Sequence, residues 1–356
     1  MDQWYASREM SLDWRIIMSI TIKDIAKKLD ISYTTVSRAL NRSPKVNSVT
    51  MEKIIQEAKK MGYQPNAIAR GLVKKYTKTI GLIIPDITKS YFSEIARSIE
   101  AVASKQGYNV LLCNTNWDKI QEITYLQMLQ EKRVDGIIMK SVVDTDENLF
   151  NNIRTPLVLF NSRAYNDNYN YIETDNVRGG FLAVKHLIEC EYKRIGFIGG
   201  KCNSYSNNQR LEGYKRALKK YNYPVDEGII VNGDFNTKSG YDIMDRLLKL
   251  KNPPDAIFAG NDVIALGALY CAQEFGLNIP MDFGIVGFDN VSFAKIPQVQ
   301  LSTIEQPKYY MGKRAIEMLI EEIKGKKRAK KIVVEPKLII RATTRNRKIN
   351  HGRLVI

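Results

Sequence analysis

The feature that most constrains the fold is an alternation of apolar runs and amphipathic segments, which begins at Thr79 and continues to Asn290. The apolar runs include TIGLIIPDI, VDGIIMKS, DAIFAGND and FGIVGFDN, and helix-patterned segments of 12–17 residues separate most of them. Strands that are apolar along their whole length are typical of parallel sheets covered by helices on both faces. About ten such runs are too many for one compact open sheet. The sequence therefore predicts an α/β body, residues 79–342, that is built as two similar lobes.

A different pattern precedes this body, because residues 18–64 contain three short helical segments. Ser32 is a good N-cap for the second segment, YTTVSRALN, and Asn47 or Ser48 can cap the third. Two short helices joined by a tight turn are typical of a helix-turn-helix. The helical spacing of apolar residues predicts a small core made of Ile22, Ile25, Ala26, Leu29, Val36, Leu40, Ile54, Ile55, Ala58 and Met61.

The second of these helices has a polar face that suits DNA, formed by Tyr33, Thr34, Ser37 and Arg38. In a helix-turn-helix the second helix lies in the major groove, with its N-terminal side chains at the base edges. An arginine can bind guanine through two hydrogen bonds, and hydroxyl groups can contact bases or phosphates. An ordinary amphipathic helix with a solvated polar face would show the same pattern, so the helix alone leaves both interpretations open.

The net charge of +16 is concentrated at the two ends of the chain. Residues 1–78 hold 15 Lys/Arg against 7 Asp/Glu, and residues 324–356 hold 12 against 1. The residues between hold 27 against 30 and are close to neutral. Basic end segments favour nucleic acid or an anionic membrane surface as a partner, although a lysine-rich tail can also be only solubilising. Residues 343–356 are expected to be a solvated basic tail.

Several functional classes are excluded by what the sequence lacks. Four widely spaced cysteines without a CxxC pair argue against a zinc ribbon or a redox motif and favour a reduced, cytoplasmic protein. No apolar run reaches the roughly 18 residues that a membrane span needs. Residues 1–17 contain five charged side chains and no apolar core, so they are expected to be a disordered extension rather than a secretory signal. Two histidines and no phosphate-binding or metalloprotease motif indicate a protein that is not an enzyme and uses no cofactor or metal.

The residues of several segments are more specific than these general patterns. TIKDIAKKLDISYTTVSRALN, followed by GYQPNAIARGL, resembles the DNA-binding and hinge segments of the LacI/GalR family of bacterial transcription regulators. The resemblance continues through TIGLIIPDITKSYFSEIARSIE, VDGIIM, GNDVIALGAL, GIVGFDN and LSTIEQP, and it covers roughly residues 18–342. It implies a helix-turn-helix head, a hinge helix and linker over residues 65–78, and a body like that of the periplasmic sugar-binding proteins.

The resemblance also assigns roles in DNA binding. Tyr33, Thr34 and Arg38 would read the major groove, and a hinge at residues 66–72 would become helical on DNA. Leu72 would then be wedged into a minor-groove step, while Asn66 and Arg70 lie in the same hinge and Arg70 neutralises phosphate. The residues that would contact or orient phosphates are Thr21, Ser32, Thr35, Ser37 and Asn41. Asp30 stands where the family usually has a turn glycine, and Gly71 lies inside the segment that must become helical.

Ligands of α/β folds bind beyond the carboxyl ends of the strands, and the residues at these ends can recognise a polyol through polar groups and aromatic faces. By resemblance, Arg210, Asn261 and Asp289 are the strongest polar contacts, and Phe235 and Phe92 are the stacking surfaces. The full predicted ligand set is Asp86, Tyr91, Phe92, Asn161, Arg210, Phe235, Asn261 and Asp289. Alternatives remain open: Asn261 and Asp289 could cap turns, Phe92 could belong to the core, and Arg210 could pair with Glu212 on the surface.

These observations predict a cytoplasmic, sequence-specific DNA-binding regulator, most simply a repressor of sugar-utilisation genes controlled by a sugar or sugar derivative in the interlobe cleft. One helix-turn-helix reads only a half-site, so a homodimer on a palindromic operator is expected. One alternative within the family is a regulator gated by a corepressor or a partner protein. The alternative from another class is a solute-binding module without a DNA function.

Overall fold

A computed structural model of the protein describes residues 20–64, 76–142, 150, 153–161, 169–202, 204–326 and 330–345. The chain divides into two compact units, residues 1–75 and 76–356. Within the described residues, no helix is long and apolar enough to cross a membrane. The same residues contain no group of His, Cys, Asp and Glu side chains that could hold a metal ion.

The N-terminal unit is a bundle of three helices, α1 (Ile22–Leu29), α2 (Tyr33–Leu40) and α3 (Ser48–Lys60). Each helix begins behind a polar N-cap whose side-chain oxygen accepts a hydrogen bond from a backbone N–H three residues further on. These caps satisfy N–H groups that have no partner inside the helix. The predicted three helices are therefore confirmed. The fully packed residues of their core are Ile25, Ala26, Val36, Ala39, Ile54 and Ala58.

One predicted core residue of this unit lies elsewhere. Ile55 was expected to face inward, but its side chain is 37% exposed. Successive residues of an α-helix are rotated by about 100°. The inward row of α3 therefore passes through Ile54, Ala58 and Met61 and leaves Ile55 beside it.

The turn between α1 and α2 accommodates the residue that replaces the usual glycine. Asp30 has φ 50° and ψ 49°, which is the left-handed conformation, and its N–H donates a hydrogen bond to the carbonyl oxygen of Ala26. Aspartate is one of the few non-glycine residues that enter this region without a large cost. The departure from the family pattern thus leaves the geometry of the turn intact.

The second unit contains two six-stranded sheets, which confirms the two similar lobes. The neighbour orders are β2-β1-β3-β4-β5-β11 and β7-β6-β8-β9-β10-β12, and every pairing is parallel except that of β12 with β10. The first sheet is formed by β1 (Thr79–Ile84), β2 (Asn109–Asn114), β3 (Gly136–Met139), β4 (Leu157–Phe160), β5 (Asn170–Thr174) and β11 (Lys331–Val334). The second is formed by β6 (Ile195–Gly199), β7 (Ile230–Asn232), β8 (Ala256–Ala259), β9 (Gly284–Asp289), β10 (Ser302–Glu305) and β12 (Lys337–Ile339).

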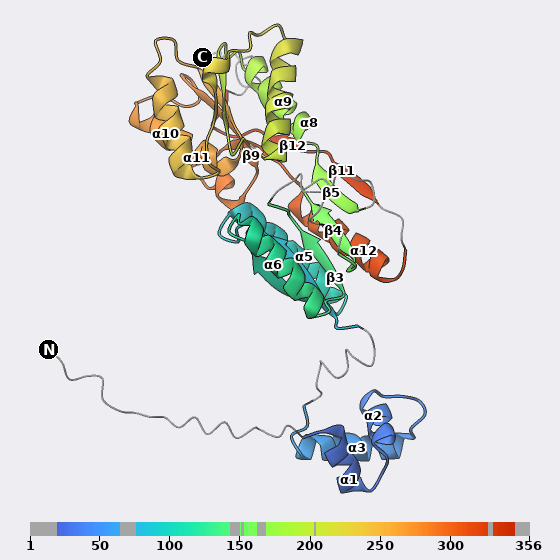
Figure 1. The fold of residues 1–356 in the computed structure, drawn as a ribbon. Helices are drawn as coiled ribbons and strands as arrows, with labels where there is room; N and C mark the ends of the chain where they lie inside the picture. The colour runs from blue at the N-terminus through green and yellow to red at the C-terminus, as the bar shows by residue number, and fades with distance from the viewer. Residues whose placement is uncertain are drawn as a thin grey trace, which may run out of the picture. The chain divides into compact units, whose positions relative to one another are not determined.

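Helices cover both faces of each sheet (Figure 1). In the first lobe α5 (Ser90–Lys105) and α12 (Lys308–Ile323) pack on one face, and α6 (Lys119–Glu131) packs on the other. In the second lobe α8 (Asn176–Glu189) and α9 (Tyr205–Lys220) lie opposite α10 (Thr237–Leu248) and α11 (Asp262–Glu274). Two short 3-10 helices, η1 (Glu227–Ile229) and η2 (Ser292–Lys295), complete the second lobe.

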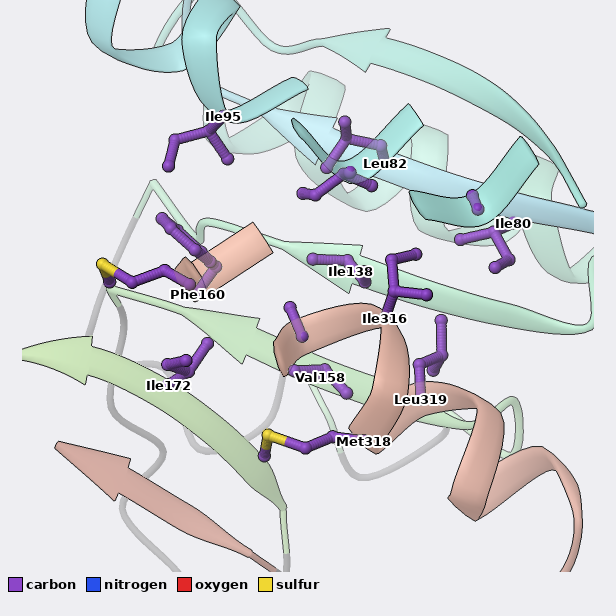
Figure 2. Packing of buried hydrophobic residues seen from close by; sticks show 14 of the residues in the cluster. Ile80, Leu82, Ile95, Ile138, Val158, Phe160, Ile172, Ile316, Met318 and Leu319 are labelled. Atoms are coloured by element: carbon purple, nitrogen blue, oxygen red, sulfur yellow. The ribbon is translucent and has the colours of Figure 1, made fainter. Parts of the chain in front are cut away.

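The first strand shows why these apolar runs are continuous. Ile80 and Leu82 point into the cluster beneath α5 and α12, where Figure 2 shows them beside Ile95 and Leu319. The next residue, Ile83, belongs to the cluster on the α6 side. Successive side chains of a strand point to opposite faces, and both faces are buried here. Each such side chain stabilises the fold by roughly 1.5–3 kcal/mol through its burial.

The chain crosses between the lobes three times, at residues 174–176, 305–308 and 334–337. At the first crossing, the helical pattern of the segment ETDNVRGGFLAVKHLIEC predicts a helix that starts at Glu173. Glu173 and Thr174 instead end β5, and α8 begins behind Asp175, whose side chain accepts a hydrogen bond from the backbone N–H of Arg178. The Asp175 cap fixes the helix start at Asn176, three residues later than periodicity alone indicates.

The C-terminal boundary also differs from the expected one. Thr343 and Thr344 were assigned to a solvated tail, but each is only 2% exposed. The N–H of Ile285 donates to the carbonyl oxygen of Thr343, and the Thr344 hydroxyl lies 2.8 Å from His186 Nε2. Residues 343–345 are therefore part of the second lobe, because they satisfy buried polar groups there. Residues 1–17 and 346–356 lie outside the described residues.

Candidate functional site

The polar face of α2 is the first candidate surface. Tyr33 is 61% exposed and Thr34 and Arg38 are also exposed, whereas Val36 is fully buried against α1 and α3. Residues 20–64 carry nine Lys/Arg and four Asp/Glu. The unit thus presents an aromatic ring, a hydroxyl and a guanidinium group on one side of a basic bundle.

The other predicted DNA-contact residues of this unit also serve its local structure. Ser32 Oγ accepts a hydrogen bond from Thr35 N (3.1 Å), and the Asn41 side chain donates to the carbonyl oxygen of Ser37 (2.8 Å). The Thr21 hydroxyl donates to Asp24 (2.7 Å) in a capping box, and these hydrogen bonds lower the pKa of Asp24. A role of these side chains at phosphates stays a prediction. Three further predicted contacts lie outside the described residues: Asn66, Arg70 and Leu72.

The second candidate surface is a cavity of about 250 Å³ at the carboxyl ends of strands from both lobes. Ligand pockets in proteins have volumes of roughly 300–1,000 Å³, so this cavity suits a small ligand. The structure brings all eight predicted ligand residues to its wall: Asp86, Tyr91, Phe92, Asn161, Arg210, Phe235, Asn261 and Asp289. Their contact with a ligand stays a prediction.

Arg210 and Asp289 form the charged centre of the cavity wall. Arg210 Nη2 lies 3.7 Å from Asp289 Oδ1, and the exposed fraction of each residue is 5%. Arg210 Nε donates to Asn176 Oδ1 (2.9 Å) and Nη1 donates to the carbonyl oxygen of Gly260 (2.5 Å). The guanidinium group also lies 3.8 Å from the centre of the Phe288 ring. These contacts fix one planar donor group in place, which is what recognition of a specific ligand requires.

Burial changes the protonation behaviour of the acidic groups in this region. Burial raises the pKa of Asp289, although the positive charges of Arg210 and Lys308 oppose the change. Burial and the neighbouring Asp289 raise the pKa of Asp262 to about 8. Asp262 accepts hydrogen bonds from the Thr303 hydroxyl and from Val291 N. Perturbed titratable groups in a cleft are typical of functional sites.

Backbone strain is also concentrated around the cavity. Three lining residues have positive φ angles: Asn161 with 45°, Asp289 with 111° and Trp117 with 63°. The Trp117 angle is the most unusual, because bulky side chains rarely enter the left-handed region. Such conformations persist only where surrounding contacts enforce them, and they gather at ligand sites.

The cavity has aromatic walls on both lobes. Phe92 and Trp117 come from the first lobe and lie edge to face, with their ring centres 6.1 Å apart. Phe235 comes from the second lobe, where its ring lies so close to Gly200 that a Cβ atom at that position would overlap it. Phe92 also belongs to the core beneath α5, so it serves packing and lines the cavity at once.

The alternatives for the polar residues have different outcomes. Asn261 does cap α11, because its Oδ1 accepts a hydrogen bond from Ile264 N (2.9 Å), and it lines the cavity as well. Arg210 does not pair with Glu212, which instead accepts a hydrogen bond from Arg216 (2.6 Å). The surface interpretation of Arg210 is therefore wrong.

Sequence reasoning missed part of the cavity wall. Trp117 and Lys201 come shortly after β2 and β6, so the strand-end argument that selected Asn161 and Asn261 could have found them. Asn236 and Ser204 are N-caps, and their signal was the polar residue before a helix. The remaining missed wall residues are Lys89, Ser90, Lys140, Ser206, Asp234, Val263 and Val291.

Comparison with known proteins gives matches for both units. Residues 21–66 match the family model described as bacterial regulatory proteins, lacI family, and residues 184–344 match the periplasmic binding protein-like domain. The HTH-type transcriptional repressor PurR of Haemophilus influenzae (strain PittEE) is 36% identical over 332 residues, which are 92% of this chain and 99% of that protein.

Two solved structures resemble this protein along most of their length. The Lac repressor dimer bound to operator and the anti-inducer ONPF has a TM-score of 0.81 and 25% identity, covering 92% of this chain and 100% of that one. A LacI family transcriptional regulator from Enterococcus faecium with bound ribose has a TM-score of 0.67 and 30% identity, covering 75% of this chain and 98% of that one.

Proposed function

Because the chain belongs to the LacI family of bacterial transcriptional regulators, which are DNA-binding repressors with a ligand-binding body, we propose that it represses genes of sugar utilisation from a palindromic operator. It acts in the cytoplasm as a homodimer, since one α2 helix reads a half-site and two-fold symmetry matches a palindrome. A small ligand in the cavity controls its affinity for the operator.

The exposed face of α2 carries the DNA-binding part of this proposal. Arg38 contacts a guanine, and Tyr33 and Thr34 contact neighbouring base edges in the major groove. The N-termini of α1, α2 and α3, which begin behind Thr21, Ser32 and Asn47, favour phosphates through their helix dipoles and remaining N–H groups. The hinge residues Asn66, Arg70 and Leu72 complete the contact in the minor groove.

The single observation that carries the ligand part is the convergence of all eight predicted ligand residues, from strand ends and helices of both lobes, on one cavity of about 250 Å³. Carboxylates, amides and a buried guanidinium group can bind several hydroxyls at once, and aromatic rings on both lobes can stack on a sugar ring. The bound ribose in the E. faecium regulator supports a ligand of this size and chemistry. The ligand has to bind the two states of the repressor with different affinity, since otherwise it shifts no equilibrium.

The protein works by binding alone, without catalysis and without a cofactor or metal. The cavity residues are arranged as donors and acceptors around a fixed ion pair, and the relatives are named as transcriptional regulators. A buried Arg210, held by two hydrogen bonds and an ion pair, suits recognition, because it has no role as a base or nucleophile at neutral pH.

The deciding experiment selects the preferred DNA from a random pool with the full-length protein and measures its affinity at one fixed salt concentration. We expect a palindromic sequence, strong discrimination against unrelated DNA, and loss of that discrimination in Arg38→Ala. Binding to all DNA with equal affinity would refute a sequence-specific repressor.

A thermal-shift screen with D-ribose, D-xylose, D-glucose, cellobiose, hypoxanthine and guanine tests the ligand class. A sugar present at 100 times its Kd stabilises the protein by about 2.7 kcal/mol, and Asp289→Asn should reduce that shift. A response only to the purines would replace the sugar by a heterocyclic corepressor. No response to any of the six compounds, together with specific DNA binding, would favour gating by a partner protein.

A further inference from the structure

Gln306 lies in the second crossing between the lobes, just after β10, and it is 1% exposed. Its Oε1 accepts hydrogen bonds from the hydroxyl of Thr174 (2.6 Å), from Asn161 Nδ2 (3.1 Å) and from the hydroxyl of Tyr91 (3.2 Å). Its Nε2 donates to Asp289 Oδ1 (2.6 Å). One buried amide thus has four side-chain partners, three of which line the cavity.

These partners come from different parts of the second unit. Tyr91 and Asn161 belong to the first lobe, Asp289 ends β9 of the second lobe, and Thr174 lies in the first crossing. Gln306 is therefore bonded to cavity residues of both lobes and to a neighbouring crossing. The hydrogen bonds within one lobe move with that lobe, but these bonds can all persist only in one relative orientation of the two lobes.

We propose that Gln306 is a positioning residue that clasps the two lobes and orients their ligand-binding side chains. The Gln306 amide and the Arg210 guanidinium group both contact Asp289 Oδ1. Within the described residues, Oδ2 of Asp289 has no hydrogen bond. A ligand hydroxyl that binds Asp289 or Asn161 changes the same network that fixes the lobe orientation. Occupancy of the cavity and arrangement of the lobes are thereby coupled through one side chain.

The chemistry of the site requires an amide. A glutamate would retain the accepting oxygen but lose the donor to Asp289, and a methionine of similar length would lose both. Two carboxylates in hydrogen-bond contact share one proton, so one of their pKa values is raised. A glutamate here would therefore imitate the amide when it is protonated and repel Asp289 when it is ionised. The charged and titratable groups that surround this pair are Arg210, Lys308, Glu94, Tyr91 and Asp262.

Trp117 supplies a local readout of the lobe arrangement. It belongs to the first lobe, and its ring centre lies 5.9 Å from Nζ of Lys201 in the second lobe. The chain has three tryptophans, and the other two, Trp4 and Trp14, lie near its start. In the full-length W4F/W14F protein, fluorescence quenching by acrylamide reports the exposure of Trp117 alone.

The test compares Q306E and Q306M with the unchanged glutamine in this background between pH 5 and pH 9, without ligand or DNA. Loss of a hydrogen bond to a charged group changes the ratio of closed to open molecules by about tenfold or more. In Q306M, acrylamide should therefore quench the Trp117 fluorescence more strongly than in the parent at every pH. Q306E should match the parent at low pH and approach Q306M as the pH rises. Q273E, the same exchange at an exposed position of α11, should follow the parent throughout.

Circular dichroism separates this role from a merely structural one. Quenching of both Gln306 variants at the parental level and without pH dependence, in proteins with native circular dichroism, would overturn the clasp even if their Tm falls. If Q306M does not fold, the pH dependence of Q306E decides alone. The inference rests on the proposed function of the cavity. Because its test uses neither ligand nor operator, failure of the clasp and failure of the proposed function are distinguishable.

Discussion

On helix α2, Tyr33 is 61% exposed and Arg38 is exposed, whereas Arg210 and Asp289 in the cavity are each 5% exposed. Within residues 20–64, Tyr33 and Arg38 have no ion pair or hydrogen bond to another side chain. Arg210 by contrast contacts a carboxylate, an amide, a backbone carbonyl and an aromatic ring. Side chains on α2 can thus be exchanged one at a time, while those of the cavity depend on one another.

This contrast has a consequence for how the two surfaces can vary. An exposed side chain affects stability little, so the exposed side chains of α2 can be exchanged without loss of the fold. A buried ion pair contributes little net stability as a pair, but removal of one partner leaves an uncompensated charge. Substitutions in the cavity wall are therefore tolerated most easily at residues that keep some exposure, such as Trp117 and Lys201.

The largest expected effect comes from breaking the buried pair. Asp289→Ala should lower the free energy of unfolding by about 3–5 kcal/mol, because Arg210 then stays buried without its carboxylate. Urea denaturation measures the change. Arg216→Ala, which removes a solvent-exposed pair with Glu212, is the matched control and should cost at most about 1 kcal/mol. Equal losses in both variants would contradict the coupled character of the cavity.

An effect of comparable size, spread over a range of pH, comes from the same buried region. The pKa of Asp262 is about 8 in the folded protein and 3.8 is its ordinary value. Between these values the folded state holds a proton that the unfolded chain has released, so this stabilisation is lost as the pH rises. Asp262→Asn keeps the hydrogen bonds, because its amide can donate to Thr303 and accept from Val291.

Urea denaturation of both proteins from pH 4 to pH 9 isolates this contribution. The parent should lose stability relative to Asp262→Asn by up to about 1.4 kcal/mol per pH unit within the window from 3.8 to about 8. A constant difference between the two proteins would show that Asp262 is ionised throughout.

On α2 the expected effect concerns DNA rather than stability. Arg38→Ala should weaken binding to the selected operator by about 1–3 kcal/mol, because two hydrogen bonds to one guanine are lost. Its free energy of unfolding should change by less than about 0.5 kcal/mol. Gel-shift titrations on operator and random DNA at one salt concentration measure the first quantity. Equal losses on both DNAs would make Arg38 a phosphate contact.

The smallest expected effect concerns Ser32, which is predicted to contact DNA and also stabilises the N-terminal unit. Ser32 Oγ caps α2 by accepting a hydrogen bond from Thr35 N. Ser32→Ala should lower the stability of the N-terminal unit by about 1 kcal/mol, whereas Ser32→Asp should preserve the cap. Thermal unfolding followed by circular dichroism measures both variants. Unchanged stability in Ser32→Ala would leave the hydroxyl only a role at phosphate.

Predictions from the sequence were more accurate for features that depend on neighbouring residues than for features that depend on distant ones. The caps at Ser32 and Asn47 were predictable because they depend on residues three positions apart. The place of the cavity was predictable because parallel strands end at one edge of a sheet, whereas Arg210, which lies in helix α9, was assigned by family resemblance. The prediction for Ile55 was wrong, because the type of an apolar residue does not show whether it lies within the inward row of a helix or beside it. Strand β10 was not predicted from its four residues, and with it Gln306 was overlooked.

The sequence by itself determined the three helices of the DNA-binding unit, the two-lobed body and the edge at which polar residues gather, because helical spacing, caps and apolar runs are local properties. The tertiary structure decided which polar groups become partners. It paired Arg210 with Asp289, brought Gln306 to both lobes and placed Thr343 and Thr344 inside the second lobe. A buried polar group must find a partner within about 3 Å, and only the folded chain decides which distant residue stands at that distance.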